Sequence, residues 1–285
     1  MPVTPFGVLL RGAMEHRGPL CVGLDPHRAL VESWGLDYCL AGVERFALTC
    51  VEALSGQVAV VKPQSAFFEV FGSGGVRLLE RVLADLRDAG TLTILDVKRG
   101  DIGSTMQAYA DAYLGTDSPL RADAITLSPF LGYGSLRPAL DLAEQTGRGL
   151  FVLALTSNSE GPQVQHAELG GRSVAATVVD GVTADNAAAA VRGELGSVGL
   201  VVGATVGDAV QRLGIDLGAA NSPVLAPGLG AQGATAADLR RVFGAALPQV
   251  LASSSREVLS AGPDVAALRA AATATAYQLR EVLAP

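Results

Sequence analysis

A buried strand followed by a charged turn is written in residues 91–105, which read Thr91-Leu92-Thr93-Ile94-Leu95-Asp96-Val97-Lys98-Arg99-Gly100-Asp101-Ile102-Gly103-Ser104-Thr105. Residues two apart on a strand share a face, so Asp96 and Lys98 are predicted to project to the same side. Gly100 is predicted to end the strand, and Asp101 and Thr105 to share one face at the start of a helix. A lysine between two acids at the mouth of an apolar strand is costly to desolvate. We interpret the segment as a proton-handling site.

Similar apolar runs recur along the chain, and their regular spacing indicates the fold. Each run is continuously apolar, which is typical of a parallel sheet covered on both faces. Eight such units within 285 residues predict a closed (β/α)8 barrel, an α/β fold, forming one domain over residues 1–285. The predicted strands are Leu20–Asp25, Val58–Pro63, Thr91–Lys98, Ala124–Pro129, Leu150–Ser157, Val198–Thr205, Pro223–Gly230 and Gln249–Ser255.

Helical segments rich in Ala and Leu separate these strands, for example Val76–Ala89 and Thr235–Phe243. The first segment, residues 4–17, is predicted to be a helix that closes the bottom of the barrel, with Thr4 as N-cap and Pro5 in the first turn. An open doubly wound sheet is the alternative. The barrel is favoured because polar residues end five different strands, whereas an open sheet concentrates them at one switch point. These residues are Asp25, Lys62, Asp96, Lys98, Thr156 and Arg256.

Composition limits the classes of function. The chain is 49% hydrophobic and 17% charged, with a net charge of -7, which argues against a nucleic-acid partner. No apolar run approaches membrane-spanning length, and the N-terminal residues show no secretory pattern. Cys21, Cys39 and Cys50 form no C-x-x-C pair and are interpreted as buried thiols in a reducing compartment. The three histidines have no metal-ligand spacing, so we expect a cytoplasmic protein without a metal site.

Two further strand ends carry charge. Lys62 ends the second strand, either as a lysine extending from the barrel rim or as part of an alternating network with Asp25 and Asp96. Asp25 precedes Pro26 and is equally consistent with a turn initiator. The residues alone do not decide between these alternatives, either for Lys62 or for Asp25.

A glycine-rich turn follows the seventh predicted strand and reads Pro227-Gly228-Leu229-Gly230-Ala231-Gln232-Gly233. It matches G-x-G-x-x-G, but it lies too late in the chain for a dinucleotide fold. Backbone N–H groups of such a turn suit a phosphate, and barrels often bind phosphate after strands seven and eight. Arg256 follows strand eight and supplies a guanidinium for the same group.

The fifth predicted strand ends in Thr156-Ser157-Asn158 and leads into a polar connection over Ser159–Arg172. A connection this long is either disordered or a lid. We favour a lid over residues 158–172, because the hydroxyl and amide groups at its root suit the edge of a heterocycle.

The pattern Asp-x-Lys-x-x-Asp-Ile-x-x-Thr over residues 96–105 resembles the signature of the orotidine 5'-phosphate decarboxylase family. The resemblance extends from about Leu20 to about Leu259, and Val-Lys-Pro-Gln-Ser-Ala-Phe-Phe-Glu over residues 61–69 resembles its long bacterial subgroup. It implies decarboxylation of orotidine 5'-monophosphate to uridine 5'-monophosphate in pyrimidine biosynthesis, without metal or cofactor.

The resemblance also implies catalytic roles. Lys98 would protonate pyrimidine C6, Asp96 would stand beside the substrate carboxylate, and Lys62 would complete the charge array. Asp101 and Thr105 would reach into the site of the neighbouring subunit of a homodimer.

Substrate contacts follow from the same resemblance. Asp25 matches an acceptor for a ribose hydroxyl, and Thr156 matches the contact to the pyrimidine amide, with Ser157 as a close competitor. The phosphate would be held at the end of the barrel by Pro227, Gly228, Gly230, Ser255 and Arg256, with Gln232 in place of the glutamine of many relatives.

Three other functions remain as alternatives. Sugar-phosphate decarboxylases and aldol-type synthases share Asp-x-Lys-x-x-Asp but bind Mg²⁺ partly through a carboxylate at the end of strand two, where this chain has Lys62. A Schiff-base aldolase would need a neutral Lys98, which the flanking acids oppose. A barrel that binds phosphate without catalysis is the third.

Overall fold

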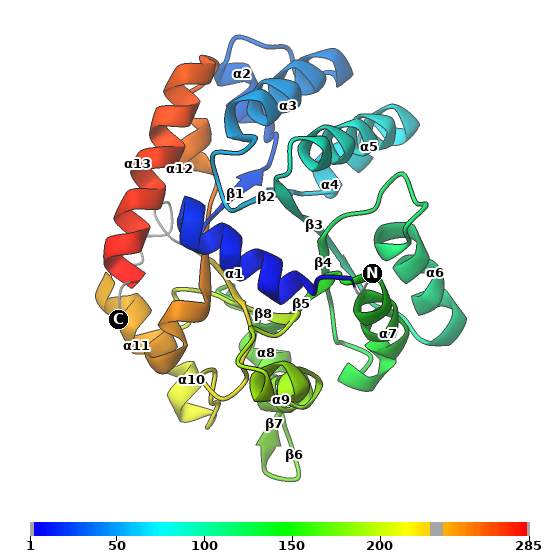
Figure 1. Ribbon diagram of the computed structural model, residues 1–285, viewed down its shortest axis with the longest axis vertical. Helices are drawn as coiled ribbons and strands as arrows, with labels where there is room; N and C mark the ends of the chain where they lie inside the picture. The colour runs from blue at the N-terminus through cyan, green and yellow to red at the C-terminus, as the bar shows by residue number, and fades with distance from the viewer. Residues whose placement is uncertain (1–2, 229–235, 284–285) are drawn as a thin grey trace.

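The computed structural model describes residues 3–228 and 236–283, and its centre is a closed barrel of parallel strands (Figure 1). Going around the barrel, the strands are ordered β1-β10-β9-β8-β5-β4-β3-β2. The predicted (β/α)8 barrel is therefore confirmed. Its strands are β1 Leu20–Leu24, β2 Val60–Pro63, β3 Leu92–Arg99, β4 Ala124–Leu127, β5 Gly149–Leu155, β8 Val198–Val202, β9 Val224–Pro227 and β10 Val250–Ser254.

Each predicted strand overlaps an observed one, but several predicted ends extend too far. The predicted Val198–Thr205 ends at Val202, and the predicted Pro223–Gly230 ends at Pro227. Sheet pairing stops at Val202 and Pro227, where the connecting loops begin. These loops retain apolar residues, so composition alone does not mark the strand end.

Helices surround the barrel and cover its outer face. Helix α5, Gly72–Asp88, shows the principle, because Leu79, Val82, Leu83 and Leu86 recur at helical spacing and are all buried. The other helices are α1 Phe6–Arg17, α2 Arg28–Ser33, α3 Leu40–Leu54, α4 Ala66–Glu69, α6 Gly103–Leu114, η1 Tyr133–Leu136, α7 Arg137–Thr146, α8 Pro162–Gln165, α9 Val174–Val191, α10 Ala209–Arg212, α11 Ala236–Phe243, η2 Gly244–Gln249, α12 Arg256–Leu259 and α13 Val265–Leu283.

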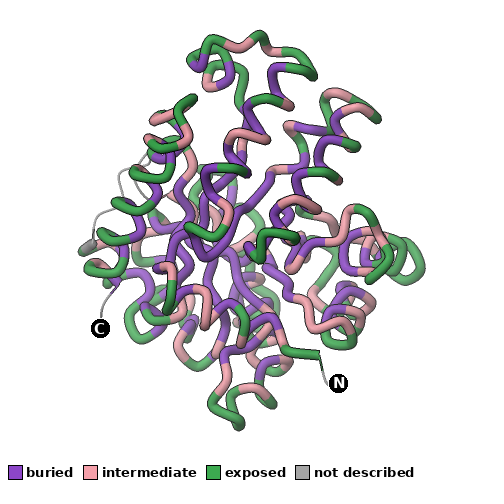
Figure 2. The backbone as a smooth tube through the Cα atoms, turned by 45° about the horizontal axis from the view of Figure 1, so that its top comes forward, coloured by how far each residue is buried: buried purple, intermediate pink, exposed green. Residues whose placement is uncertain are grey.

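The core has two layers, and buried backbone concentrates in the strands and on the inner faces of the helices (Figure 2). The larger layer lies between the strands and the surrounding helices. The smaller one fills the barrel, where Phe6, Leu10 and Met14 of α1 pack with inward-facing strand residues. The Phe6 ring meets Phe151 of β5 edge-on at 6.1 Å.

Helix α1 begins later than predicted. It starts at Phe6, and the N-cap position belongs to Pro5, which makes no side-chain capping bond. The assignment of Thr4 as N-cap is therefore wrong. Pro5 has the extended backbone of a residue flanking a helix, so the proline stands just outside the first turn.

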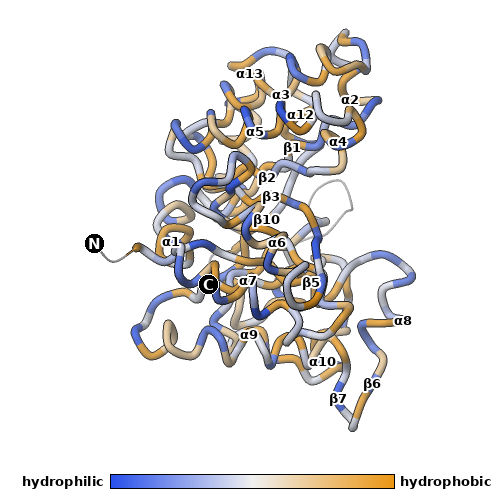
Figure 3. The backbone as a smooth tube through the Cα atoms, turned by 90° about the vertical axis from the view of Figure 1, so that its right-hand side faces the viewer, coloured by the Kyte–Doolittle hydropathy of each residue, from blue (hydrophilic) through white to orange (hydrophobic). Residues whose placement is uncertain are grey.

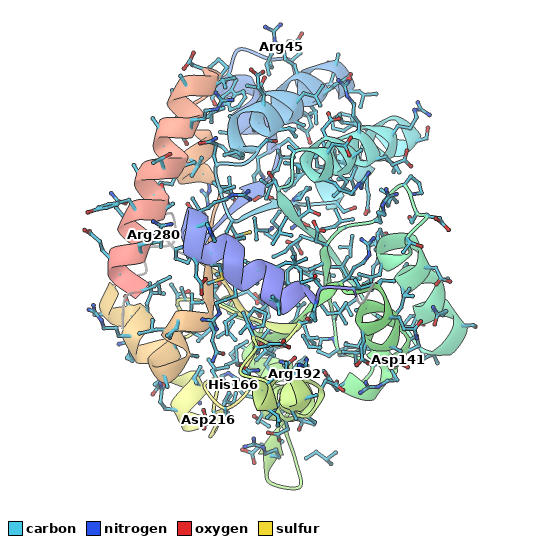
Figure 4. All side chains as sticks on the ribbon, viewed as in Figure 1. Arg45, Asp141, His166, Arg192, Asp216 and Arg280 are labelled. Atoms are coloured by element: carbon cyan, nitrogen blue, oxygen red, sulfur yellow. The ribbon has the colours of Figure 1, made fainter. Side chains whose placement is uncertain are left out.

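Peripheral charges mostly face solvent, as the labelled side chains in Figure 4 illustrate. One such charge is held in place: Arg280 on α13 donates from Nη2 to the carbonyls of Glu15 and His16 at the end of α1.

The cysteine prediction is partly wrong: Cys21 and Cys50 are buried, whereas Cys39 is exposed. Within residues 3–228 and 236–283, no helix is long and apolar enough to cross a membrane.

The segment predicted as a lid contains regular structure. It includes α8 and a two-stranded hairpin, β6 Glu168–Leu169 with β7 Arg172–Ser173, which turns at Gly170 and Gly171. Both glycines have positive φ, the conformation that favours glycine in tight turns. In the side view of Figure 3 this segment projects from the barrel end opposite α1.

Candidate active site

A cavity of about 330 Å³ opens at the carboxyl ends of the barrel strands. This is the end at which barrel enzymes assemble their sites from several strands. The residues lining it are Asp25, His27, Lys62, Gln64, Asp96, Lys98, Thr126, Leu153, Thr156, Val201, Leu225, Pro227, Gly228, Ser253, Ser255 and Arg256. The six polar residues predicted to end strands are all among them.

Charges in the cavity alternate in sign. The Nζ atom of Lys62 lies 2.9 Å from Oδ2 of Asp96 and 4.0 Å from Oδ1 of Asp25. Lys98 Nζ lies 2.7 Å from Oδ1 of Asp96. The Lys62 and Asp96 side chains are almost fully buried, but that of Lys98 is 46% exposed and faces the open cavity. The predicted alternating network is thus present, and Lys62 is not a solvated lysine of the rim.

Burial and neighbouring charges act in opposite directions on these groups. Burial disfavours the ionised carboxylate of Asp96, but the charges of Lys62 and Lys98 prevail and hold its pKa below the usual range. Burial also disfavours the ammonium of Lys62, yet Asp25 and Asp96 outweigh it and raise the lysine pKa above its ordinary value. Both groups therefore remain ionised at neutral pH.

The only lysines in the sequence are Lys62 and Lys98, so every ammonium side chain of this protein lies in the cavity. Beneath Lys62, burial raises the pKa of the Cys21 thiol to about 12. A thiol with such a pKa is protonated at neutral pH and is a poor nucleophile. The reactive groups of the cavity are therefore its carboxylates and cations.

Strand β3 is irregular where it carries the site. Its pairing with β4 runs from Leu95 opposite Ile125 to Arg99 opposite Leu127, so three residues of β3 face one of β4. Lys98 has a φ of 45°, which residues bearing a Cβ rarely adopt. The prediction that Asp96 and Lys98 share a side is confirmed by their ion pair. Plain strand alternation is the wrong reason, because a bulge re-aims Lys98.

Asp25 follows β1, and only one of its two carboxylate oxygens accepts a hydrogen bond from the described residues. Its Oδ2 accepts a hydrogen bond from Ser255 Oγ at 2.8 Å. Its buried Oδ1 has no hydrogen-bond donor among the described residues. A Cβ at Gly23 would lie 2.0 Å from Ser255 Oγ, so only glycine allows this approach. An unsatisfied buried acceptor in a cavity suits a ligand hydroxyl.

Thr156, just after β5, is held by the segment that follows it. Gln165 of α8 receives the Thr156 backbone N–H on Oε1 at 2.9 Å and donates from Nε2 to the threonine Oγ1 at 2.6 Å. Thr156 Oγ1 in turn donates to Oδ1 of Asn158 at 2.6 Å. One glutamine thus fixes the root of α8 against the cavity wall. Sequence reasoning missed Gln165, because nothing local links it to a residue nine positions earlier.

Some predicted site residues do not line this cavity. Asp101 lies before α6 rather than in it, and its Oδ1 accepts the backbone N–H of Ile102 at 2.8 Å, so the predicted shared helical face with Thr105 is wrong. Thr105 is exposed on α6, and Ser157 is exposed beyond the cavity lining. Gly230 and Gln232 lie outside the described residues, as does most of the glycine-rich turn.

Other lining residues were not predicted. Gln64 follows Lys62 by two positions, a spacing that could have placed it at the same strand end. Thr126 is a polar residue inside an apolar strand, which is itself a signal. Leu153, Val201 and Leu225 form an apolar wall of the cavity, and the same residues pack in the core layer that fills the barrel.

Within the described residues, no group of three or more His, Cys, Asp or Glu side chains could hold a metal ion. The carboxylates Asp25 and Asp96 are separated by Lys62, whose ammonium repels a cation.

A second cavity of about 170 Å³ lies between α7 and α9, where Arg137 is paired with Asp185. The reactive groups converge only on the first of these two cavities.

The family model described as orotidine 5'-phosphate decarboxylase / HUMPS family matches residues 18–271. Curated orotidine 5'-phosphate decarboxylases include a Salinispora arenicola protein that is 61% identical over 279 residues, and a Streptomyces coelicolor protein that is 59% identical over 281 residues. Each alignment covers 98% of this chain and 98% of the relative.

Solved structures agree with these matches. A Streptomyces avermitilis crystal structure described as an orotidine 5'-phosphate decarboxylase is 57% identical, with a TM-score of 0.95 over 100% of this chain and 98% of that one. A Leishmania donovani OMP decarboxylase is 30% identical, with a TM-score of 0.76 over 98% and 99% of the two chains.

Proposed function

The chain belongs to the orotidine 5'-phosphate decarboxylase family and decarboxylates orotidine 5'-monophosphate to uridine 5'-monophosphate, and from that premise we propose that Lys98 protonates pyrimidine C6. The enzyme is a carboxy-lyase of pyrimidine biosynthesis. The observation that carries the proposal is the half-exposed Lys98 ammonium, 2.7 Å from a buried Asp96 carboxylate.

The reaction requires stabilisation of charge at carbon. The bond from C6 to the carboxylate breaks, CO₂ leaves, and the electron pair remains on C6, where no carbonyl is placed to delocalise it. An ammonium fixed beside that carbon stabilises the developing charge and then donates its proton. Lys98 is suited to this role because its side chain reaches the open cavity, so solvent can restore the proton.

Asp96 acts on the bound substrate before decarboxylation. Lys62 acts on Asp96 and, through it, on the position of Lys98. Asp96 stays ionised, so a substrate carboxylate placed near it is repelled and is released from that repulsion as CO₂. Lys62 neutralises much of the buried negative charge of Asp96, and its Nζ donates to Oδ2 of Asp96 at 2.9 Å. The pair fixes the Asp96 carboxylate so that Oδ1 faces Lys98.

Substrate binding uses the rest of the rim. We assign Oδ1 of Asp25, which accepts no hydrogen bond from the described residues, to a ribose hydroxyl, and Thr156, with Ser157 beside it, to the pyrimidine amide. Arg256 carries the charge for the phosphate. The neighbouring contacts proposed for the phosphate are Ser255, Pro227, Gly228, Gly230 and Gln232, of which the last two lie outside the described residues.

We propose a homodimer in which Asp101 and Thr105 complete the partner's site. The segments after β3 and β4 lie side by side, because the Ser128 N–H donates to the Arg99 carbonyl at 2.8 Å. Large apolar side chains on these segments are exposed: 62% for Ile102 and 76% for Phe130. Exposed apolar residues beside polar ones, here Asp101 and Thr105, are typical of a surface that contacts another subunit.

The remaining assignments concern the whole chain. We propose that residues 1–285 form one domain with the N-terminal helix closing the barrel, and that residues 158–172 act as a lid. The lid is supported by the start of this segment close after Thr156, which lines the cavity, and by the Gln165 contacts to Thr156. Free thiols at Cys21, Cys39 and Cys50 are compatible with a cytoplasmic location.

A spectrophotometric assay tests the function. Purified protein should deplete the absorbance of orotidine 5'-monophosphate and form uridine 5'-monophosphate at the same rate with and without EDTA. Activity lost in EDTA and restored by Mg²⁺ would support the metal-dependent alternative. Tight binding of uridine 5'-monophosphate without any turnover would support a barrel that only binds.

A further inference from the structure

The bulge that carries Asp96 and Lys98 faces a single residue of the neighbouring strand. Residues 96–98 of β3 lie opposite Thr126 alone, between the pairs Leu95 with Ile125 and Arg99 with Leu127. A bulge leaves backbone groups without their regular ladder partners. Those groups need another partner if the bulge is to keep one conformation.

The Thr126 hydroxyl supplies that partner. Its oxygen accepts the backbone N–H of Lys98 at 3.0 Å, and its hydrogen is donated to Oδ1 of Asp96 at 2.7 Å. Thr126 is only 1% exposed, so neither bond competes with bulk water. One hydroxyl therefore links the backbone of one site residue to the carboxylate of the other.

Both bonds act on features whose geometry depends on their surroundings. Lys98 has a φ of 45°, which a residue with a Cβ adopts only when its surroundings hold it there. Asp96 Oδ1 receives the Lys98 ammonium as well as Thr126, so the threonine fixes the oxygen that Lys98 must reach. Losing the hydroxyl would remove the support of the lysine backbone and leave the orientation of the carboxylate to Lys62 and Lys98 alone.

We propose that Thr126 is a positioning residue for decarboxylation, which sets the location of the Lys98 ammonium by clamping the β3 bulge. The inference rests on the proposed function, in which Lys98 delivers the proton. Thr126 acts through Asp96 and Lys98 rather than on the reacting carbon. Its effect should therefore appear in kcat and not in substrate binding, since a displacement of about 1 Å at a reacting group can cost about 100-fold in rate.

The chain contains a matched control at the other end of the same strand pair. Thr93 of β3 is also buried, donates its hydroxyl to Oδ2 of Asp123 at 2.9 Å, and accepts the Asp123 backbone N–H at 3.2 Å. Thr93→Val thus removes the same pair of bonds as Thr126→Val, but far from the cavity. Thr126→Ser keeps the hydroxyl and removes only a methyl group.

The test compares these variants with wild-type enzyme in steady-state decarboxylation. For Thr126→Val we expect kcat to fall about 10- to 100-fold with KM within about threefold of wild type. Thr126→Ser should recover most of kcat, and Thr93→Val should keep wild-type kcat. Unchanged kcat in Thr126→Val, an equal fall in Thr93→Val, or no recovery in Thr126→Ser would each overturn the proposal.

A spectroscopic readout separates positioning from general loosening. Because the sequence has only two lysines, lysine labelled with ¹³C at Cε gives signals for Lys62 and Lys98 alone. Thr126→Val should shift the Lys98 signal, whereas Thr93→Val should not, and an unmoved Lys98 signal in Thr126→Val contradicts the inference. Thr126→Ala replaces the valine variant if the latter does not fold. Failure of wild-type enzyme to turn over substrate would refute the proposed function instead.

Discussion

Asp96 accepts three donors that reach it from different strands. Lys62 comes from β2, Thr126 from β4, and Lys98 from its own strand. A buried carboxylate is tolerable only when its oxygens are satisfied in this way. If any one of these donors is removed, the buried Asp96 carboxylate loses part of the hydrogen bonding that stabilises its negative charge. The charged and polar contacts of the cavity are therefore centred on this one carboxylate.

Acid stability reports the charge state of Asp96. The pKa of Asp96 in the folded protein lies below its ordinary value of 3.8, so the unfolded chain binds the proton first as pH falls. The stabilisation from this shift is present above about pH 4 and is lost on acidification, by about 1 kcal/mol between pH 5 and pH 3. Asp96→Asn should lose less stability than wild type over that interval, measured by urea unfolding. An equal loss in both proteins would rule out the shift.

Asp25 offers a test of ribose binding. Its Oδ1 has no hydrogen-bond donor among residues 3–228 and 236–283, so Asp25→Ala removes an acceptor that is open to the ligand. A hydrogen bond to a charged group is worth about 1.5–3 kcal/mol, which predicts a fall of about 10- to 100-fold in kcat/KM. Asp123→Ala, at the opposite end of the barrel, is the control and should lower stability without this kinetic effect. Unaltered kcat/KM in Asp25→Ala would remove the assignment.

At the scale of residues, the sequence predicts those site residues that stand at the ends of strands. Asp25, Lys62, Asp96 and Lys98 interrupt apolar runs, and in a parallel barrel such positions converge. Thr126 and Gln165 escaped prediction because their roles depend on partners brought close only by strand pairing or by a returning loop.

At the scale of elements, the loops after β3 and β4 pack backbone against backbone. A Cβ on Gly100 would lie 2.2 Å from the carbonyl oxygen of Ser128, which cannot move aside as a side chain can. The absence of a side chain at residue 100 therefore sets how closely the charged turn approaches β4. Strand periodicity predicts β3 but not its bulge, since the bulge arises from pairing with β4.

Gly100→Ala should displace the turn and lower turnover by at least about tenfold, because Lys98 and Asp101 lie on either side of it. Gly12→Ala on α1 is the control, since nothing lies within 4 Å of its added Cβ and alanine favours a helix by up to about 1 kcal/mol. Kinetic assays and thermal unfolding of both variants check the prediction. Wild-type turnover in Gly100→Ala would show that the loops accommodate the methyl group.

At the scale of the whole molecule, eight continuous apolar runs sufficed to predict the barrel, because parallel strands covered on both faces leave no polar alternation. Assembly is less accessible to sequence. Asp101 does not line the cavity of its own chain, and the proposed homodimer would place it at the cavity of the partner.

Subunit exchange tests that shared site. Lys98→Ala and Asp101→Ala enzymes should each be inactive, but a hybrid dimer contains one cavity with both side chains intact. Random mixing makes half of the dimers hybrids, so we expect about one quarter of wild-type activity after exchange. Remixing each variant with itself is the control. Activity that stays at the level of the separate variants would show that Asp101 does not act across an interface.

Turnover by Lys98→Ala tests most directly whether the Lys98 ammonium delivers the proton to C6. We predict a loss of at least about 100-fold in kcat, the usual contribution of a positioned general acid, with uridine 5'-monophosphate binding retained. Arg81→Ala, which removes an exposed cation paired with Glu44, should keep wild-type kcat. Wild-type turnover in a folded Lys98→Ala enzyme would contradict the account.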